Sequence, residues 1–393
     1  FAGAMTLQML FSSISRVLAT QAMLLAVGLG MKSALPLAAV TSWVLKDGLG
    51  HLGAIAFGTL VNKRFDSDPK RYRFWAAVLG KIADLVSVLT LSRPELFLLL
   101  STLGSACGRI SQGASTSCRA KIYETFSLQH NLGDLVRCSQ SQSTAAQLLG
   151  TGIGAALGPL LAVDVLRLLA CSLFFSTITL GCAYKCSAVV QLNTLNVQRA
   201  ELIFDQVISS IRSHEGGSLL GSKGRGLNSS AETIGNLTVL NTGEVQGLEA
   251  FVLPYRSVFQ NALSSVNPPL DTGHLFLVPE AGLHATPYTL ALMLQASESA
   301  AGKTGREQPC GIAIWFHASA KPPDVIRGFF HNCLLRALLR EGSADRLQGD
   351  LLQERSELLM QVWWPPVAVA LKKRGWRDDV AFLDAREDRI VIT

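Results

Sequence analysis

Two long stretches without a charged residue constrain this chain more than any other feature of its sequence. Thr144 to Val163 runs for 20 residues, and Leu168 to Tyr184 for 17, without Asp, Glu, Lys or Arg. A third stretch, Val17 to Val40, carries only Lys32. A lipid bilayer requires about 20 mostly apolar residues in a helix. We therefore expect these three stretches to cross a membrane.

Three further stretches have a weaker apolar character, namely Val44–Val61, Phe74–Leu91 and Leu96–Gly108. The last has only 13 residues, so we expect a short, tilted or re-entrant segment there. Six segments bring the basic stretches Asn62–Arg73 and Arg109–Arg137 to one face. The positive-inside rule places that face, with both termini, in the cytoplasm or the equivalent compartment. The alternative is a large soluble domain of buried helices.

Charge is distributed unevenly along the 393 residues. Residues 1–186 hold 16 basic and 8 acidic residues, whereas residues 187–393 hold 19 and 21. Charged residues make up only 16% of the chain, against about 25% in ordinary soluble proteins. This composition excludes a disordered chain, a coiled coil and a nucleic-acid-binding arm, and we expect no nucleic-acid partner. The eight cysteines are too sparse for a disulfide scaffold.

The fold class that follows is mainly α. We expect a multi-pass helical domain over residues 1–190, a helix and a flexible Gly/Ser-rich linker over 191–242, and a smaller soluble α+β domain over 243–393. The first residue is not Met and no signal peptide of the usual form is predicted, so we expect a processed chain or a fragment. The elements predicted after residue 190 are helices over Leu192–Arg212, Pro323–Arg340 and Arg346–Arg374 (one helix, or two interrupted at Pro365–Pro366), and short strands over Leu275–Val278, Gly311–Phe316 and Ala381–Thr393.

Glycine spacing predicts close helix packing. Gly150, Gly154 and Gly158 are four residues apart and share one helix face, which lets a second helix approach closely. Gly48, Gly50 and Gly53 form a literal GxGxxG, the pattern of a dinucleotide-binding turn. The acidic residues that should end the second strand of such a site lie in a basic polar loop, and no βαβ pattern follows. We therefore assign these glycines to helix packing as well.

Ionisable residues next to apolar segments are candidates for function, because charges at membrane depth are unfavourable and often functional. Lys81 and Asp84 are three residues apart and are expected to pair. Lys46 and Asp47 are adjacent, so their side chains point about 100° apart and we do not expect them to pair with each other. Lys46 either binds a ligand or extends to the membrane interface. We find no motif for a catalytic or metal site, and predict none.

The sequence resembles the root UVB sensitive family, which is also labelled vitamin B6 photo-protection and homoeostasis. The strings that carry the resemblance run in order from about Arg16 to Arg199: VLATQAMLLAVGLG, WVLKDGLGHLG, NKRFDSDPKRYRFWAAVLGKIADL, HNLGDLVRCSQSQSTAAQLLGTGIGAALG and LNTLNVQRA. The chain departs from the family pattern at Ala77, where an Asp is usual, and at Gln142–Ser143, where an acidic residue is usual.

The resemblance implies a membrane-associated protein, located in plastids in several plant members and linked there to UV-B response, auxin transport and vitamin B6 balance. It implies no established cofactor, although pyridoxal phosphate or another B6 vitamer is a candidate ligand. The residues that match family motifs or flank apolar segments are our candidates for ligand binding: Lys46, Asp47, His51, Asp66, Lys70, Arg73, His130, Asn131, Asp134 and Gln140.

Three functions remain open at this point. The first is a membrane protein that binds or moves a small ligand, drawn by the basic face of Lys63, Arg64, Lys70, Arg71 and Arg73, unless these charges only set the topology. The second is a non-catalytic adaptor that assembles a complex with a family member or another protein. The third is an enzyme that uses Asp47, His51, Asp66 or His130, although we expect no enzymatic activity.

Overall fold

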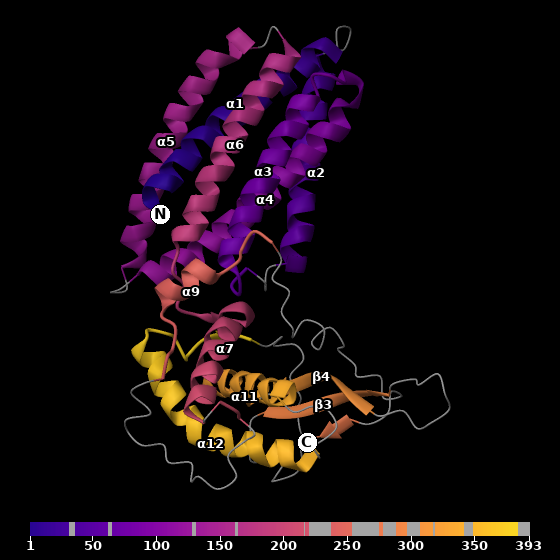
Figure 1. Cartoon of the computed structure of the whole chain (residues 1–393). Coiled ribbons are helices and arrows are strands. Elements are labelled where there is room, and N and C mark those ends of the chain that lie inside the picture. Colours follow the sequence, from indigo (N-terminus) through magenta and orange to yellow (C-terminus); the bar gives the residue numbers. More distant parts are fainter. Residues whose placement is uncertain are drawn as a thin grey trace. The chain divides into compact units, whose positions relative to one another are not determined.

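The charge-poor half of the sequence folds into six long α-helices in the computed structural model (Figure 1). The chain divides into two compact units, one of Phe1–Leu192 with Phe251–Leu253 and one of Asn193–Ala250 with Pro254–Thr393. Residues 191–242, where we expected a helix and a flexible Gly/Ser-rich linker, belong from Asn193 onward to the second unit. The structure describes residues 1–30, 36–61, 65–127, 131–161, 164–215, 217–219, 237–253, 275–277, 288–296, 307–316, 319–341 and 349–383.

The first unit is a bundle in which successive helices run antiparallel (Figure 1). Helix α1 packs against α5, α6 and α3, whereas α4 packs against α3 and α2. The mainly helical fold expected from the sequence is confirmed. The helices are α1 (Ala2–Gly30), α2 (Pro36–Val61), α3 (Pro69–Leu89), α4 (Phe97–Phe126, preceded by the 3-10 turn η2, Pro94–Leu96), α5 (Leu132–Leu161) and α6 (Val165–Val189).

Two predicted segments differ from the observed helices. The apolar stretch Val17–Val40 is divided, because α1 ends at Gly30 and α2 begins at Pro36, a residue suited to the first turn of a helix. Leu96–Gly108 is not a short segment, since α4 continues for 30 residues to Phe126. The basic residues between Arg109 and Phe126 that we assigned to a loop are therefore part of α4. Three helices, at Ala2–Gly28, Leu132–Leu161 and Val165–Val189, are long and apolar enough to cross a membrane.

Glycines bring α1 and α5 into close contact. A Cβ atom at Gly154 would lie 2.9 Å from Cβ of Val17, and one at Gly150 would collide with the carbonyl oxygen of Leu10. Gly158 lies in the same way against Gln21. Ser13 reinforces the contact by donating to the carbonyl oxygen of Gln147 at 2.9 Å. The ladder of three glycines thus replaces side chains that would hold the two helices apart.

Glycine and serine residues also allow α4 to pack closely against α3 and α2. A Cβ at Gly104 would lie 2.7 Å from Oγ of Ser87, and one at Gly50 would lie 2.5 Å from Oγ of Ser105. A Cβ at Gly53 would lie 3.2 Å from Cβ of Ala106. Gly48 has no atom within 4 Å of such a position, so the helix-packing role that we expected for it is not present in this structure.

The second unit combines helices with short strands. Strands β2 (Leu275–Leu277), β3 (Tyr288–Ala296) and β4 (Glu307–Phe316) form an antiparallel sheet, and β1 (Leu195–Asn196) pairs in parallel with β5 (Ala381–Phe382). The sequence predicted β2, β4 and β5 but missed β3. The helices are α7 (Val197–His214), α9 (Thr242–Leu248), α11 (Pro322–Glu341) and α12 (Gly349–Lys373), of which α9 was also missed. Residues 384–393, where a further strand was predicted, lie outside the described residues.

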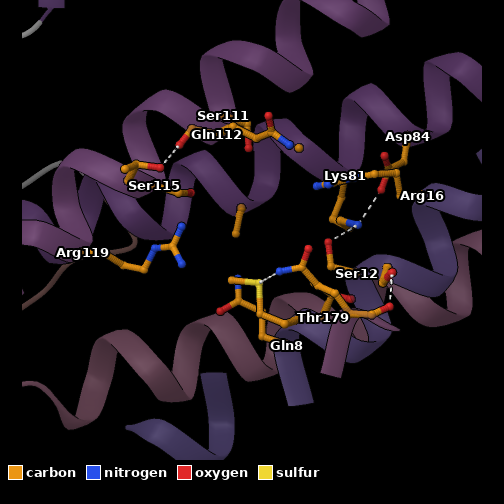
Figure 2. A pocket seen from close by; sticks show the side chains of 16 residues that line it. Gln8, Ser12, Arg16, Lys81, Asp84, Ser111, Gln112, Ser115, Arg119 and Thr179 are labelled. Carbon is orange, nitrogen blue, oxygen red and sulfur yellow. Dashed lines mark hydrogen bonds and ion pairs between the residues drawn. The ribbon is translucent and has the colours of Figure 1, made fainter. Parts of the chain in front are cut away.

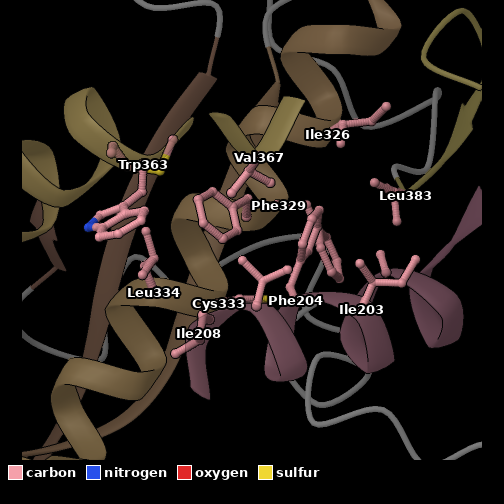
Figure 3. Packing of buried hydrophobic residues seen from close by; sticks show 14 of the residues in the cluster. Ile203, Phe204, Ile208, Ile326, Phe329, Cys333, Leu334, Trp363, Val367 and Leu383 are labelled. Carbon is pink, nitrogen blue, oxygen red and sulfur yellow. The ribbon is translucent and has the colours of Figure 1, made fainter. Parts of the chain in front are cut away.

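Three helices build the core of this unit (Figure 3). Phe204 of α7 contacts Phe329 and Phe330 of α11 with ring centroids 6.2 and 5.1 Å apart. Helix α12 adds Trp363 and Val367, both buried. Since these two residues lie on either side of Pro365–Pro366, their burial holds α12 continuous through the two prolines, and the predicted interruption is absent.

A buried histidine links the sheet to two helices of the second unit. His331 of α11 lies 3.3 Å through Nδ1 from Oη of Tyr288 and 3.2 Å through Nε2 from Oγ of Ser356. Burial, with a smaller contribution from the positive charge of Arg327, lowers the pKa of His331 to about 4. Burial also raises the pKa of Tyr288 to about 12. Both side chains are therefore neutral in the folded protein near pH 7.

We predict that Gly150→Ala loosens the α1–α5 contact, because the added methyl group meets the backbone of Leu10. The free energy of unfolding of the first unit should fall by about 1–3 kcal/mol, the usual effect of overpacking. Gly152→Ala is the matched control, since nothing lies within 4 Å of its Cβ position, and it should be neutral or stabilising by up to about 1 kcal/mol. Equal midpoints of thermal unfolding for both variants would contradict a close contact.

We predict that acid destabilises the second unit through His331. Because the folded pKa is below the usual value of about 6.5, the folded state binds fewer protons, and stability present above that pH is lost as pH falls toward 4. The loss should reach about 3 kcal/mol, measured by native-state hydrogen exchange of the α11 amides. His331→Gln should remove this part of the pH dependence. The exposed His214→Gln should keep it, and the opposite pattern would refute the assignment.

Candidate functional site

A polar cavity of about 250 Å³ lies inside the first unit, between α1, α3 and α4. Figure 2 shows Gln8 and Ser12 of α1 facing Ser115 and Arg119 of α4 across it. Helices α5 and α6 each contribute one lining residue, Gln147 and Thr179. The position follows from the packing, because α1 and α4 are each drawn toward other helices. The lining residues are Gln8, Met9, Ser12, Ser13, Arg16, Ala77, Gly80, Lys81, Asp84, Ser111, Gln112, Ser115, Thr116, Arg119, Gln147 and Thr179.

The charges in this cavity are unbalanced. Lys81 and Asp84 form the predicted ion pair, with Nζ 2.5 Å from Oδ2, and their side chains are only 6% and 13% exposed. Lys81 also donates to Oγ of Ser12 at 3.1 Å. Arg16 and Arg119 line the same cavity and form no ion pair with any carboxylate among the described residues. Three cationic side chains therefore face one carboxylate.

A second cavity of about 300 Å³ adjoins the first. The two share Arg16, Gly80, Asp84, Ser111 and Gln112, so they meet at the middle of α1, α3 and α4. The second cavity adds two further cations, Lys46 of α2 and Arg109 of α4, and no further carboxylate. Five cationic side chains thus line the two cavities together with one carboxylate, Asp84, and two of them, Lys46 and Arg109, also contact Asp47 outside the lining. Such a lining favours a negatively charged occupant.

Lys46 and Asp47 behave differently from the sequence expectation. The Nζ of Lys46 lies 3.4 Å from Oδ1 of Asp47 and 3.9 Å from the centroid of the Trp43 ring. The prediction that these adjacent side chains do not pair is wrong, because the flexible four-carbon stem of lysine reaches around the helix to its neighbour. Arg109 approaches the same carboxylate oxygen at 3.4 Å, which ties α2 to α4.

The other candidates from the sequence lie away from the cavities. Lys70 and Arg73 are buried. Arg73 donates through Nη2 to Oε1 of Gln8 at 3.0 Å, so it supports a residue that lines the cavity without lining the cavity itself. Asn131, Asp134 and Gln140 are exposed near the start of α5, and His51 and Asp66 are exposed as well. None of these seven lines a cavity. His130, with Lys63 and Arg64 of the basic face, lies outside the described residues.

Sequence reasoning missed most of the cavity lining. Gln8, Ser12 and Arg16 recur every four residues in an apolar helix, and Gln112, Ser115 and Arg119 repeat nearly the same spacing in α4. Residues at these spacings share one helix face. This polar stripe was the signal that could have identified the cavity. It was overlooked because Arg109 and Arg119 had been assigned to a loop.

Metal chemistry finds no support in the part of the chain that the structure describes. It contains no group of three or more His, Cys, Asp or Glu side chains that could hold a metal ion. The cysteines described there, including Cys182 and Cys186, are free thiols.

The string LNTLNVQRA has a structural role in the second unit. Oδ1 of Asn196 caps α7 by accepting from the backbone N–H of Arg199 at 2.9 Å. The guanidinium of Arg199 donates through Nε to Glu249 at 2.9 Å, and both side chains are almost fully buried. Its Nη1 also donates to the carbonyl oxygen of Thr194. The string therefore joins β1, α7 and the segment after α9.

These features define a helical protein with long apolar helices around a polar interior. The chain belongs to the root UVB sensitive family, as the resemblance predicted: residues 1–210 match the family model described as the vitamin B6 photo-protection and homoeostasis domain. No solved structure matches the chain.

Curated relatives extend the similarity beyond the family model. The chain is 32% identical over 386 residues to protein root UVB sensitive 4 of Arabidopsis thaliana, which covers 95% of this chain and 66% of that protein. It is 25% identical over 376 residues to protein root UVB sensitive 3 of the same plant, covering 95% and 77%. It is 31% identical over 206 residues to RUS family member 1 of Dictyostelium discoideum, covering 52% and 39%. The chain thus spans just under two thirds of the first relative's length.

We predict that Arg199→Met lowers the free energy of unfolding of the second unit by about 3–5 kcal/mol, because it leaves the carboxylate of Glu249 buried without its charge partner. The double variant Arg199→Met/Glu249→Leu should lose less than the sum of the two single variants. Chemical denaturation of all three variants measures the difference. Additive losses would show that the two side chains do not act as a pair.

Proposed function

We propose that this chain is a multi-pass membrane protein whose helical unit binds a small anionic molecule in the two polar cavities. The observation that carries the proposal is the charge of the lining, which holds five cations and a single carboxylate, Asp84. Lys46 and Arg109 also contact Asp47, so Arg16 and Arg119 are the cations without a carboxylate partner among the described residues. Arg16 is exposed and Arg119 is half-buried, so water can hydrate both guanidinium groups in the empty protein, and an anion can replace that water in the occupied one.

The outer surface of the helices supports a membrane location. Leu148, Leu166 and Phe174 are 72%, 71% and 61% exposed on α5 and α6, and both helices are long enough to span a bilayer. Large exposed apolar areas are unfavourable in water and favourable in lipid. By contrast, Arg16 lies in the middle of α1 and faces the cavities. Charged residues within membrane helices normally face the interior or a water-filled cavity in this way.

The size and chemistry of the cavities narrow the ligand. Each volume is near the lower end of ligand sites, which begin at about 300 Å³, so a small molecule fits better than a lipid. The family description names vitamin B6, and pyridoxal phosphate is a vitamer that carries a phosphate. A hormone-like carboxylic acid has the same charge character. A relative, protein root UVB sensitive 2 of Arabidopsis thaliana, is named as chloroplastic. By analogy, a plastid membrane is the location that we propose for this chain.

The test measures binding to the full chain in lipid nanodiscs by isothermal titration. We expect inorganic sulfate, inorganic phosphate and pyridoxal phosphate to bind, and pyridoxine, which lacks the phosphate, to bind more weakly. Arg119→Gln should weaken the binding of all three anions by about tenfold or more, since it removes a charge-assisted hydrogen bond.

Arg167→Gln is the matched control for this prediction. Its side chain is 72% exposed on α6, pairs with Asp164 and lines neither cavity, so anion binding should not change. Failure of all three anions to bind would refute the proposal. Equal binding of pyridoxine and pyridoxal phosphate would also contradict it, as would an Arg167→Gln variant that binds as weakly as Arg119→Gln.

A further inference from the structure

The carboxylate of Asp84 occupies a special position in the candidate site. It is the one acidic side chain among the residues lining either cavity, and it lines both of them. Its oxygen Oδ2 accepts from Nζ of Lys81 at 2.5 Å and from Oγ of Ser15 at 3.2 Å. Figure 2 shows the Lys81–Asp84 pair at the edge of the first cavity, with Arg16 beside it.

All the other charged groups that line the two cavities are positive, and Asp47, outside the lining, contacts two of them, Lys46 and Arg109. Lys81 comes from its own helix, Arg16 from α1, Lys46 from α2, and Arg109 and Arg119 from α4. Helices α5 and α6 contribute only uncharged residues to the lining, Gln147 and Thr179. A bound anion would neutralise much of the positive charge and add repulsion of its own.

Lys81 makes the competition between Asp84 and an anion direct. Its ammonium group is 6% exposed and is already shared between Asp84 and Ser12. An anion that pairs with Lys81 from the cavity must therefore replace Asp84 as its counter-charge. The carboxylate would then be left buried next to a second negative charge, and both effects favour its protonated form.

The structure also provides a partner for a protonated Asp84. Oγ of Ser15 lies 3.4 Å from Oγ of Ser176 on α6, and either hydroxyl can be the donor. Ser15 now donates a hydrogen bond to Asp84, but by rotating its hydroxyl hydrogen toward Ser176 it can accept a hydrogen bond from the carboxylic acid instead. Both serines are buried, so protonation need not leave a polar group unsatisfied.

We propose that Asp84 couples anion binding to proton binding: an anion that pairs with Lys81 displaces Asp84, which takes up one proton from water. This inference rests on the proposed anion site and adds to it the uptake of a proton together with the ligand. Since the added proton cancels one negative charge, the pair of cavities gains less charge on binding than an uncoupled site would. A site with this property favours movement of an anion together with a proton across an apolar barrier.

The experiment uses sulfate, whose charge does not change near neutral pH, and the full chain in lipid nanodiscs. Titration in two buffers of different ionisation enthalpy gives the number of protons taken up with each sulfate. We expect the uptake to approach one proton, and the affinity for sulfate to rise by up to about tenfold for each pH unit lowered. This measurement on the unaltered protein needs no variant.

Asp84→Asn mimics the protonated form and releases Lys81. We expect it to bind sulfate about tenfold more tightly near neutral pH, to lose the pH dependence and to take up no proton. Glu95→Gln is the control, because that side chain is 61% exposed in the turn η2 and lines neither cavity, and it should behave as the unaltered protein.

The outcomes separate the two proposals. Sulfate binding without proton uptake by the unaltered protein overturns the coupling and leaves the anion site standing. If sulfate does not bind, the coupling is wrong, and so is the proposal that the cavities accept a simple inorganic anion. Proton uptake that persists in a folded Asp84→Asn variant assigns the proton to another group and overturns the role of Asp84.

Discussion

The separation of α1 from α4 is the constraint on which the rest of the first unit depends. Glycines draw each of these helices toward other partners, α1 to α5 through Gly150 and Gly154, and α4 to α3 through Gly104. Helices that approach closely on one side leave room on the other, and here that room is lined by the polar stripes of α1 and α4. Small residues at the contacts therefore determine where the cavities lie, although glycine itself contributes no chemistry to them.

The charges then determine what the cavities can hold. Lys81 is buried and compensated by Asp84, a pair whose separation would leave a buried charge and cost several kcal/mol. Arg16 is exposed, and Arg119 is partly buried, so water can hydrate both when no ligand is present. The cations thus fall into two groups. Lys81 is paired within the protein, whereas Arg16 and Arg119 are available to a ligand. A bound anion gains most from the two arginines and competes with Asp84 for Lys81.

The sequence predicts the helices well and the cavities poorly, for a physical reason. Apolar length and small-residue spacing are local properties, and they correctly indicated six helical segments and the face of α5 that contacts α1. The cavity depends on which faces of non-adjacent helices meet, and a single sequence does not contain that information. Counting charges as loop markers also failed at Arg109 and Arg119, because a helix can turn its charges toward a hydrated interior. Strand β3, the central strand of its sheet, was missed for a related reason, since its pairing with β2 and β4 is set by tertiary contacts.

Motif matching selected a different set of residues from the one that the cavities bring together, and burial explains the difference. Asn131, Asp134 and Gln140 belong to a family-like string but remain in solvent, where a polar group gains little from a new partner because water already satisfies it. Asn196 and Arg199 belong to another such string and are fully engaged in capping α7 and pairing with Glu249. Gln8, Arg16 and Arg119 match no motif, yet they line the cavity, where Gln8 is buried, Arg119 is half-buried and Arg16 is exposed. The cavity lining thus draws on both sources, since Lys46, Lys81 and Asp84 lie within family-like strings and the polar stripes of α1 and α4 lie outside them.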